Sequence, residues 1–515
     1  MVRHFVCNNT DTIVQTQAGK LRGFIQDGTY VFQGIKYADA KRFQMPTPVE
    51  PWEGIKDALA YGYVCPLMMQ DHPTNELMVP HRYWPQDENC QYLNVWTQTL
   101  CPKAKKPVMV WLHGGGFAAG SSIEQVAYDG ENMSRNGDVV VVSINHRLNI
   151  LGYLDLEPFG EKYKNSANAG SADMVAALQW IHDNIANFGG DPENVTIFGQ
   201  SGGGMKVWTL MQTPSADGLF QKGVVQSGLI DGFLPPNGDG THIVNAMLKE
   251  LGFEEGDAEK LETVPYPTLV AAYQKVAMEV GKAGHYVGGN PMPNDFYLGD
   301  PREVGFCEHA KTIPVMIGTV FGEFAFGPGI AGRNTMSEEE KKAMIHEKYG
   351  DASDRLIELF RTAYPEKNLT DLMVLDSLFR QPTMDFVAKK SVHQEAPTWS
   401  YVFAYEFPFE EGKPAWHCSE IPFVFDNTNL VPVCCIPGVS DKLEAQIFTA
   451  WMNFAKYGNP NHPGIPEWPA SKEGDEATMI FDRKCEMKHN YDHELVNLHM
   501  EAAPKFSFAN VKVEH

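Results

Sequence analysis

The chain alternates between short apolar runs and longer segments in which apolar residues recur every three or four positions. Residues 94–97, 107–112 and 138–144 are rich in Val, Ile, Leu and Trp, and residues 138–144 form a nearly continuous apolar run. Such a run is typical of a strand that is covered on both faces of a sheet. The same composition predicts four further strands, at residues 194–199, 222–227, 314–320 and 399–405.

Residues 173–188 have the periodicity of an amphipathic helix. The apolar side chains at Met174, Ala177, Leu178, Ile181 and Ile185 follow one another at intervals of three or four residues. Strands that alternate with helices predict an α/β fold, with a mostly parallel central sheet and helices on both faces.

Three other segments have a different pattern. Residues 11–33 alternate with Gly turns and predict small antiparallel strands. Residues 235–310 and 330–395 are helical and loop-rich, and we expect them to be insertions that form a wall over an active site.

Composition limits the possible classes of protein. The chain has 515 residues, of which 43% are hydrophobic, so it can bury a large core. We expect one domain over residues 1–515, because folds of this kind grow by insertion. The formal net charge of −23 opposes binding to nucleic acid and to anionic membranes.

Targeting and metal signals are weak. The first residues lack the apolar stretch of a signal peptide, and no apolar run approaches 18 residues, so a cytoplasmic enzyme without a membrane anchor is the simplest interpretation. Nine cysteines are too sparse for a disulfide scaffold, and their spacing matches no zinc pattern. We expect no metal and no cofactor.

The predicted strand at residues 194–199 leads into Gly199-Gln-Ser-Gly-Gly203, followed by a helix-compatible stretch. A serine at a sharp strand-to-helix turn, flanked by glycines, is the context of a nucleophile elbow. The small neighbours let strand and helix approach, and the helix N-terminus favours negative charge near Ser201. The alternative is a glycine-rich loop whose serine only caps a helix.

A second loop, His113-Gly-Gly-Gly-Phe117, follows the predicted strand 107–112. This pattern supplies backbone N–H groups to an oxyanion hole in lipases and esterases. A flexible connection is the structural alternative. Gly114, Gly116 and Ala119 also fit the dinucleotide fingerprint G-x-G-x-x-A, although the residues after it are weakly helical. One acyl-transfer chemistry explains both glycine-rich loops.

A serine nucleophile of this fold needs an acid and then a histidine later in the chain. Eleven of the 17 histidines follow Ser201, and spacing alone does not choose among them. Position favours Glu323, just past the strand that ends at residue 320, and His417, in a loop after the strand at 399–405. A solvated glutamate and a capping histidine are the alternatives.

The sequence resembles the type-B carboxylesterase family, which includes cholinesterases and bacterial para-nitrobenzyl esterases. The resemblance runs nearly end to end. It is carried by the segments Glu88-Asn-Cys-Gln-Tyr-Leu-Asn-Val-Trp96, Asn145-His-Arg-Leu-Asn-Ile-Leu-Gly-Tyr153, Gly318-Thr-Val-Phe-Gly-Glu323, His417-Cys-Ser-Glu-Ile-Pro-Phe-Val-Phe425 and Trp451-Met-Asn-Phe-Ala-Lys-Tyr-Gly-Asn-Pro460.

The resemblance implies the α/β-hydrolase fold and a role for each of several residues. Ser201, Glu323 and His417 correspond to the family's catalytic triad, and Gly115, Gly116 and the amide of Gly202 to its oxyanion hole. Further correspondences are a serine near the catalytic histidine (Ser227), a buried ion pair (Arg147 and Asp173) and an N-terminal disulfide (Cys65 and Cys90).

The chain departs from the family pattern at three points. Gln200 stands where the family usually has Glu, which removes a negative charge beside His417. The segment from Cys65 to Cys90 has no Trp at the spacing that cholinesterases use for a quaternary ammonium, since Trp84 is too close to Cys90. This argues against choline esters. A cytoplasmic setting would also leave the two cysteines reduced.

The sequence therefore predicts a serine carboxylesterase that acts on a small-molecule ester, as a monomer or homodimer. A non-catalytic, cholinesterase-like binding module is the alternative, and the presence of all three triad residues argues against it. Aromatic residues flank the catalytic loops and are candidates either for a substrate pocket or for core packing: Phe117, Phe321, Phe324 and Phe326.

Overall fold

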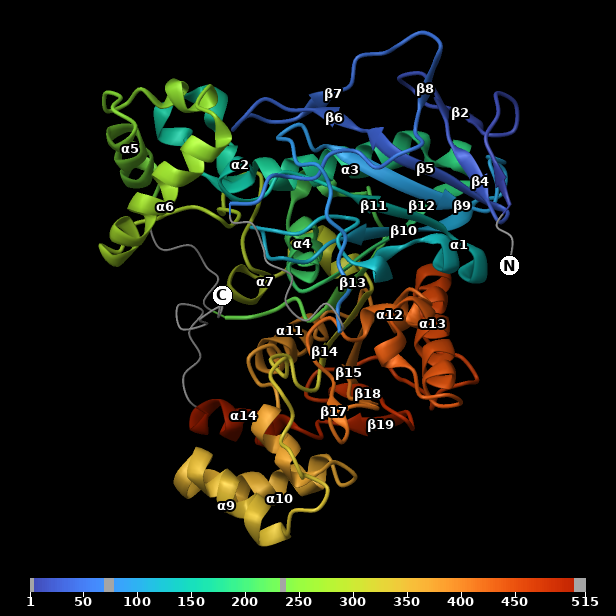
Figure 1. Cartoon of the computed structure of the whole chain (residues 1–515), viewed down its shortest axis with the longest axis vertical. Helices are drawn as coiled ribbons and strands as arrows, with labels where there is room; N and C mark the ends of the chain where they lie inside the picture. Colours follow the sequence, from blue (N-terminus) through green and yellow to red (C-terminus); the bar gives the residue numbers. More distant parts are fainter. Residues whose placement is uncertain (1–3, 69–77, 232–237, 504–515) are drawn as a thin grey trace.

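The fold is built around one large twisted sheet. The computed structural model describes residues 4–68, 78–231 and 238–503 (Figure 1). Within them, twelve strands form the sheet in the order β1-β4-β5-β9-β11-β10-β12-β13-β14-β15-β18-β19. The strands from β11 to β18 in this order are parallel, whereas both edges are antiparallel. The predicted α/β-hydrolase fold with a mostly parallel central sheet is confirmed.

The sheet strands have the following bounds: β1 Phe5–Val6, β4 Phe24–Gln26, β5 Thr29–Lys36, β9 Tyr92–Thr97, β10 Lys106–Leu112, β11 Val140–Ile144, β12 Gly190–Gln200, β13 Lys222–Gln226, β14 Val315–Val320, β15 Thr398–Phe403, β18 Ala477–Phe481 and β19 Glu486–His489. Three small sheets pair β2 Ile13–Gln15 with β3 Lys20–Arg22 and β8 Ile55–Asp57, β6 Ala38–Asp39 with β7 Thr47–Pro48, and β16 Glu406–Phe407 with β17 Lys413–Pro414.

The helices are α1 Glu131–Gly137, α2 Asn149–Tyr153, α3 Ala169–Asn184, α4 Gly202–Met211, α5 Thr241–Glu250, α6 Tyr266–Lys282, α7 Pro301–Val304, α8 Glu308–Thr312, α9 Glu338–Tyr349, α10 Ser353–Ala363, α11 Arg380–Lys390, α12 Ile421–Val424, α13 Ser440–Tyr457 and α14 His493–Ala502.

Both faces of the sheet are covered, as the continuous apolar runs predict. Along β10, Val108 and Val110 pack in one cluster with side chains of α3 and α4, whereas Met109 and Trp111 pack on the other face with α13. This alternation follows from the two-residue period of a strand. A single domain over residues 1–515 stays a prediction, supported by a sheet that takes strands from both ends of the chain.

The two predicted insertions are helical. The first contains α5 and α6, which have a small core of their own, and the second contains α9 and α10, at the bottom of Figure 1. Other parts of the insertions approach the predicted catalytic loops. Residues 290–303 line a cavity together with Phe117 and Met205, and residues 378–379 pack in one cluster with the same two side chains.

Two differences from the predicted elements have a physical reason. The predicted helix at 173–188 begins earlier, at Ala169, because its first turn is made of small residues without apolar periodicity. Gly170 there lies directly against the Arg147 carbonyl, where a Cβ would clash. The strands β18 and β19 were not predicted; β19 is short and polar at the sheet edge.

Candidate active site

Ser201 stands between β12 and α4, at the turn that the sequence predicts. Its backbone has φ 58° and ψ −124°, a conformation that a non-glycine residue adopts only under strain. Its amide donates to the Gln226 carbonyl of β13 (2.8 Å), and its carbonyl accepts from Met205 of α4 (3.0 Å). The strained serine is therefore held by the sheet on one side and the helix on the other.

The loop after β10 lies directly against this turn. A Cβ on Gly202 would collide with the main chain of Gly116, and a Cβ on Gly114 would come within 3.6 Å of Ser201 Cβ. Gly115 and Gly116 have φ of +86° and +61°, which glycine adopts without strain. The three predicted oxyanion residues, Gly115, Gly116 and Gly202, are thus brought together beside Ser201.

Hydrogen bonds to carbonyl groups fix the peptide planes of this loop. The His113 Nδ1 donates to the Gly114 carbonyl (2.9 Å), and the Ala119 amide donates to the Gly115 carbonyl (2.9 Å). In a planar trans peptide the C=O and the following N–H point in opposite directions. Fixing these two carbonyls therefore fixes the directions of the Gly115 and Gly116 amides.

The dinucleotide interpretation of this loop is wrong. A fingerprint loop opens a helix, and its glycines place phosphate at the helix N-terminus. After β10 the chain instead forms turns and a 3-10 segment, Val126–Tyr128, and the next α-helix starts at Glu131.

Glu323 and His417 meet as the sequence predicts. The His417 Nδ1 donates a hydrogen bond to the Glu323 Oε2, and the His417 amide donates to the Glu323 carbonyl (3.1 Å). Glu323 follows β14 and is fully buried, with its other carboxylate oxygen accepting from the Val320 amide (3.0 Å). An imidazole that gives Nδ1–H to a carboxylate keeps Nε2 as the basic atom.

Charge near the imidazole favours its protonated form. Burial lowers the pKa of His417, but the Glu323 carboxylate beside it and, more weakly, Glu420 outweigh burial, so the pKa lies above its usual value. Burial, together with repulsion from Glu323, raises the pKa of Glu420 to about 7. Burial and Glu323 also raise the pKa of Asp376 well above its usual range. Glu420 and Asp376 thus favour their neutral forms around Glu323.

Gln200 contacts His417 directly. Its Nε2 lies 3.3 Å from both ring nitrogens of His417, and its Oε1 accepts from the Cys418 thiol (3.1 Å). Cys418 itself has φ 76°, an unusual conformation for a non-glycine residue. The thiol therefore orients the amide so that its nitrogen faces the imidazole.

Ser227 lies in the same region but does not bond to the histidine. Its amide donates to the Gly318 carbonyl (2.7 Å), whereas its buried Oγ has no hydrogen-bond partner among the described residues. The neighbouring Gln226 donates instead to Glu420 (3.2 Å).

Two structural pairs implied by the resemblance also lie together. Arg147 and Asp173 form a fully buried ion pair, with 2.6 Å between Nη2 and Oδ1. Cys65 and Cys90 are both buried in one small cluster with Leu148 and Leu151, and both are free in this structure. Their disulfide stays a prediction.

The four phenylalanines have different surroundings. Phe117 lines a cavity of about 330 Å³ with Met205, Trp208, Ile230 and Tyr297. Phe321 belongs to the core, packed on Phe360 and Tyr364, and Phe326 packs against the same core. Phe324 is 42% exposed, with its ring 5.9 Å from that of Phe379. Charged residues also line the cavity: Asp231, Asp300, Arg302, Glu303, Asp385 and Lys389.

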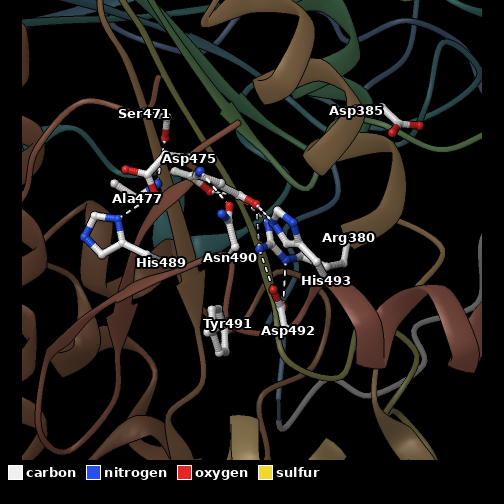
Figure 2. Close-up of polar contacts among 12 residues, drawn as sticks. Arg380, Asp385, Ser471, Asp475, Ala477, His489, Asn490, Tyr491, Asp492 and His493 are labelled. Atoms are coloured by element: carbon white, nitrogen blue, oxygen red, sulfur yellow. Dashed lines mark hydrogen bonds and ion pairs between the residues drawn. The ribbon is translucent and has the colours of Figure 1, made fainter. Parts of the chain in front are cut away.

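Phe379, which the sequence analysis missed, forms a wall beside the histidine, with its ring 5.2 Å from that of His417. The next residue, Arg380, is anchored in the interior. It pairs with Glu476 (2.8 Å) and with Asp492 (2.8 Å), and His493 also bonds to Glu476 (2.6 Å; Figure 2). The C-terminal part of the chain thus holds the segment that carries Phe379.

The sequence analysis also missed Cys418 and Lys206. Cys418, like Phe379, gives no local signal, because its role depends on contacts with distant segments. Lys206 is fully buried in α4, and a lysine inside an apolar helix is a signal that could have been noticed.

Among the described residues, no group of His, Cys, Asp and Glu side chains is arranged to hold a metal ion. In the same residues, no helix combines the length and apolarity needed to cross a bilayer.

The fold and the Ser, His and Glu residues beside two glycine-rich loops define a serine hydrolase of the α/β-hydrolase class. The model of the carboxylesterase family matches residues 10–499, and the chain belongs to this family.

Individual relatives agree with this assignment. The para-nitrobenzyl esterase of Bacillus subtilis is 34% identical over 497 residues, which cover 94% of this chain and 98% of the relative. The phenmedipham hydrolase of Pseudarthrobacter oxydans is 30% identical over 498 residues, which cover 92% of this chain and 95% of the relative. The solved structure of an esterase from the anaerobic Clostridium hathewayi, described as able to hydrolyze aliphatic aromatic polyesters, is 56% identical in sequence and has a TM-score of 0.95. The match covers 97% of this chain and 100% of that one. The chain is a serine carboxylesterase, and the alternative of a non-catalytic binding module is not supported.

Proposed function

We propose that Ser201 is the nucleophile, His417 the general base and Glu323 the residue that orients it. In the first step, His417 Nε2 takes the proton of Ser201 as its Oγ attacks the ester carbonyl carbon. The amides of Gly115, Gly116 and Gly202 stabilise the oxyanion. The protonated histidine then gives its proton to the leaving alcohol, and water releases the acid in a second step of the same kind.

The observation that carries this proposal is the bond between His417 and Glu323 next to a strained serine. Ser201→Ala should lower kcat by roughly 10⁴-fold or more with folding intact, since nucleophile and base act as a unit. Glu323→Gln and His417→Ala should each be severely impaired. Ser143→Ala, at a buried serine of β11, is the matched control. A Ser201→Ala variant with a tenth of wild-type turnover would remove Ser201 from this role.

For the substrate, we propose esters that carry an aromatic ring, including short aliphatic–aromatic oligoesters. The aromatic side chains Phe117, Trp208 and Tyr297 around the cavity support this class, as does the polyester hydrolysis described for the Clostridium hathewayi esterase. A panel of nitrophenyl, feruloyl, terephthalate and triglyceride esters tests it. Higher kcat/KM for triglycerides than for every aromatic acyl ester would contradict the proposal. Cytoplasmic location and the monomer or homodimer state remain predictions.

A further inference from the structure

Lys206 is a buried cation that the reaction described above does not use. It lies on α4, five residues after Ser201, and its side chain has no exposed surface. Burying an ammonium group is costly, so a lysine at this depth indicates a specific role.

The hydrogen bond of Lys206 goes to the first residue of the oxyanion loop. The Nζ donates to the His113 carbonyl (2.8 Å). That carbonyl lies where β10 ends, and the first turn of α4 packs directly on it, since a Cβ on Gly203 would lie 3.1 Å from the same oxygen. Lys206 therefore joins the helix that carries Ser201 to the loop that would bind the oxyanion.

The loop's successive carbonyls are held one after another. Lys206 holds the carbonyl of His113, the His113 imidazole holds that of Gly114, and the Ala119 amide holds that of Gly115. Each held carbonyl fixes the opposite N–H of its own peptide plane. The bond from Lys206 fixes the peptide plane between His113 and Gly114. It thereby also fixes the position of the His113 Cα, which carries the imidazole.

We propose that Lys206 is a positioning residue that sets the oxyanion hole of this enzyme relative to Ser201. This inference rests on the proposed roles of Ser201, Gly115 and Gly116. Lys206 does not touch the substrate; it acts through His113.

The surroundings of Lys206 are consistent with this role. Burial lowers its pKa to about 7, while Glu124 and Cys65 act in the opposite direction. The rings of His113 and His146 stack at 5.0 Å, and burial, together with the nearby lysine, lowers the pKa of both well below the usual value. Charged or neutral, the lysine amine keeps N–H donors for the carbonyl.

The test compares Lys206→Met with Lys390→Met. Lys390 is an equally buried lysine on α11 whose Nζ also donates to a backbone carbonyl, that of Lys311 (3.0 Å). On one nitrophenyl ester, Lys206→Met should lose about 10- to 100-fold in kcat with KM within about 3-fold, a smaller loss than complete removal of an oxyanion donor. Lys390→Met should keep wild-type kcat.

Two inhibitors separate positioning from general destabilisation. A trifluoromethyl ketone forms an oxyanion on the serine, and its affinity should fall by the same factor as kcat; a product acid forms none and should bind as before. Lys206→Gln keeps a neutral N–H donor and should have a higher kcat than Lys206→Met. If Lys206→Met does not fold, Lys206→Gln takes its place in the comparison.

A folded Lys206 variant with the kcat and ketone affinity of Lys390→Met would overturn the inference, as would equal losses for both inhibitors. Labelling by a fluorophosphonate distinguishes this failure from failure of the proposed function. Wild-type protein that is not labelled at Ser201 refutes the nucleophile itself, whereas labelled wild type with an unaffected Lys206 variant refutes only the role of the lysine.

Discussion

At the scale of single residues, Gln200 is one of the three points at which the sequence departs from the family pattern that it resembles. The amide nitrogen lies 3.3 Å from the imidazole, close enough for a charge at this position to act on the histidine. A neutral amide cannot stabilise an imidazolium, so in the proposed mechanism that stabilisation comes from the Glu323 carboxylate.

Gln200→Glu should move the acidic limb of the kcat/KM profile to higher pH. A carboxylate beside His417 favours its protonated form and raises its pKa further, and the base must be neutral to act, so activity is lost at a higher pH than in the wild type. The measurement is a pH–rate profile on one neutral ester. Gln212→Glu is the control, because it introduces a buried glutamate at the far end of α4, away from His417.

An acidic limb that stays in place or moves down in Gln200→Glu would mean that the introduced group is neutral or does not act on His417. The variant should also favour cationic esters over neutral ones, which gives a second readout on the same protein.

Much of the candidate site could be predicted from the sequence, except for residues whose roles depend on tertiary contacts. Ser201 and the two glycine-rich loops have local signals in sequence. Glu323 and His417 were narrowed down by their positions after predicted strands and identified by family resemblance. Phe379 and Cys418 could not be found, because what matters is the approach of Phe379 to His417 and of Cys418 to Gln200 in the folded chain.

At the scale of elements, α14 closes over the segment that leads to Phe379. His499 of α14 is buried between Ser377 (2.8 Å from its Nδ1) and Tyr349 of α9 (3.0 Å from its Nε2). Apolar runs predicted most strands of the central sheet, because those strands are covered on both faces. The prediction missed β18, although it is buried along its length, and it missed β19 and the start of α3, which consist of polar or small residues.

Protonation of His499 should weaken this packing in acid. Burial lowers its pKa to about 4, helped by the charge of Lys348, while the unfolded chain has the ordinary value of about 6.5. Between these values the unfolded state binds the proton and the folded state does not, so the free energy of unfolding falls as pH falls from about 6.5 to about 4.

His499→Gln should therefore flatten the pH dependence of stability in this range. Urea denaturation at several pH values measures it, and His489→Gln, at a histidine half exposed beside Asp475, is the control. Equal slopes in wild type and His499→Gln would contradict the assignment.

At the scale of the whole molecule, the net charge of −23 produces a negative field around the protein, and the cavity beside the candidate site adds Asp231, Asp300, Glu303 and Asp385. Only Arg302 and Lys389 oppose these carboxylates among the residues that line it, and Arg302 is already paired with Asp231 and Asp300.

This field should discriminate between substrates by charge. For an anionic ester, kcat/KM should rise as salt is added at constant pH, because salt screens repulsion over about 10 Å at 0.1 M. A neutral ester of the same size should show little change. Steady-state kinetics on the two esters from about 0.01 to about 0.3 M salt, over which the Debye length falls from about 30 Å to below about 8 Å, measure the effect. A falling kcat/KM for the anion would contradict it.

The central claim is that an acyl group passes through Ser201. Rapid mixing with a nitrophenyl ester, acid quenching and mass spectrometry of the peptides measure this most directly. We predict a burst of nitrophenol before the steady state, and an acyl group on the peptide that contains Ser201, absent in Ser201→Ala. An acyl group on a different residue, or turnover without any acylated peptide when a burst is seen, would contradict the account.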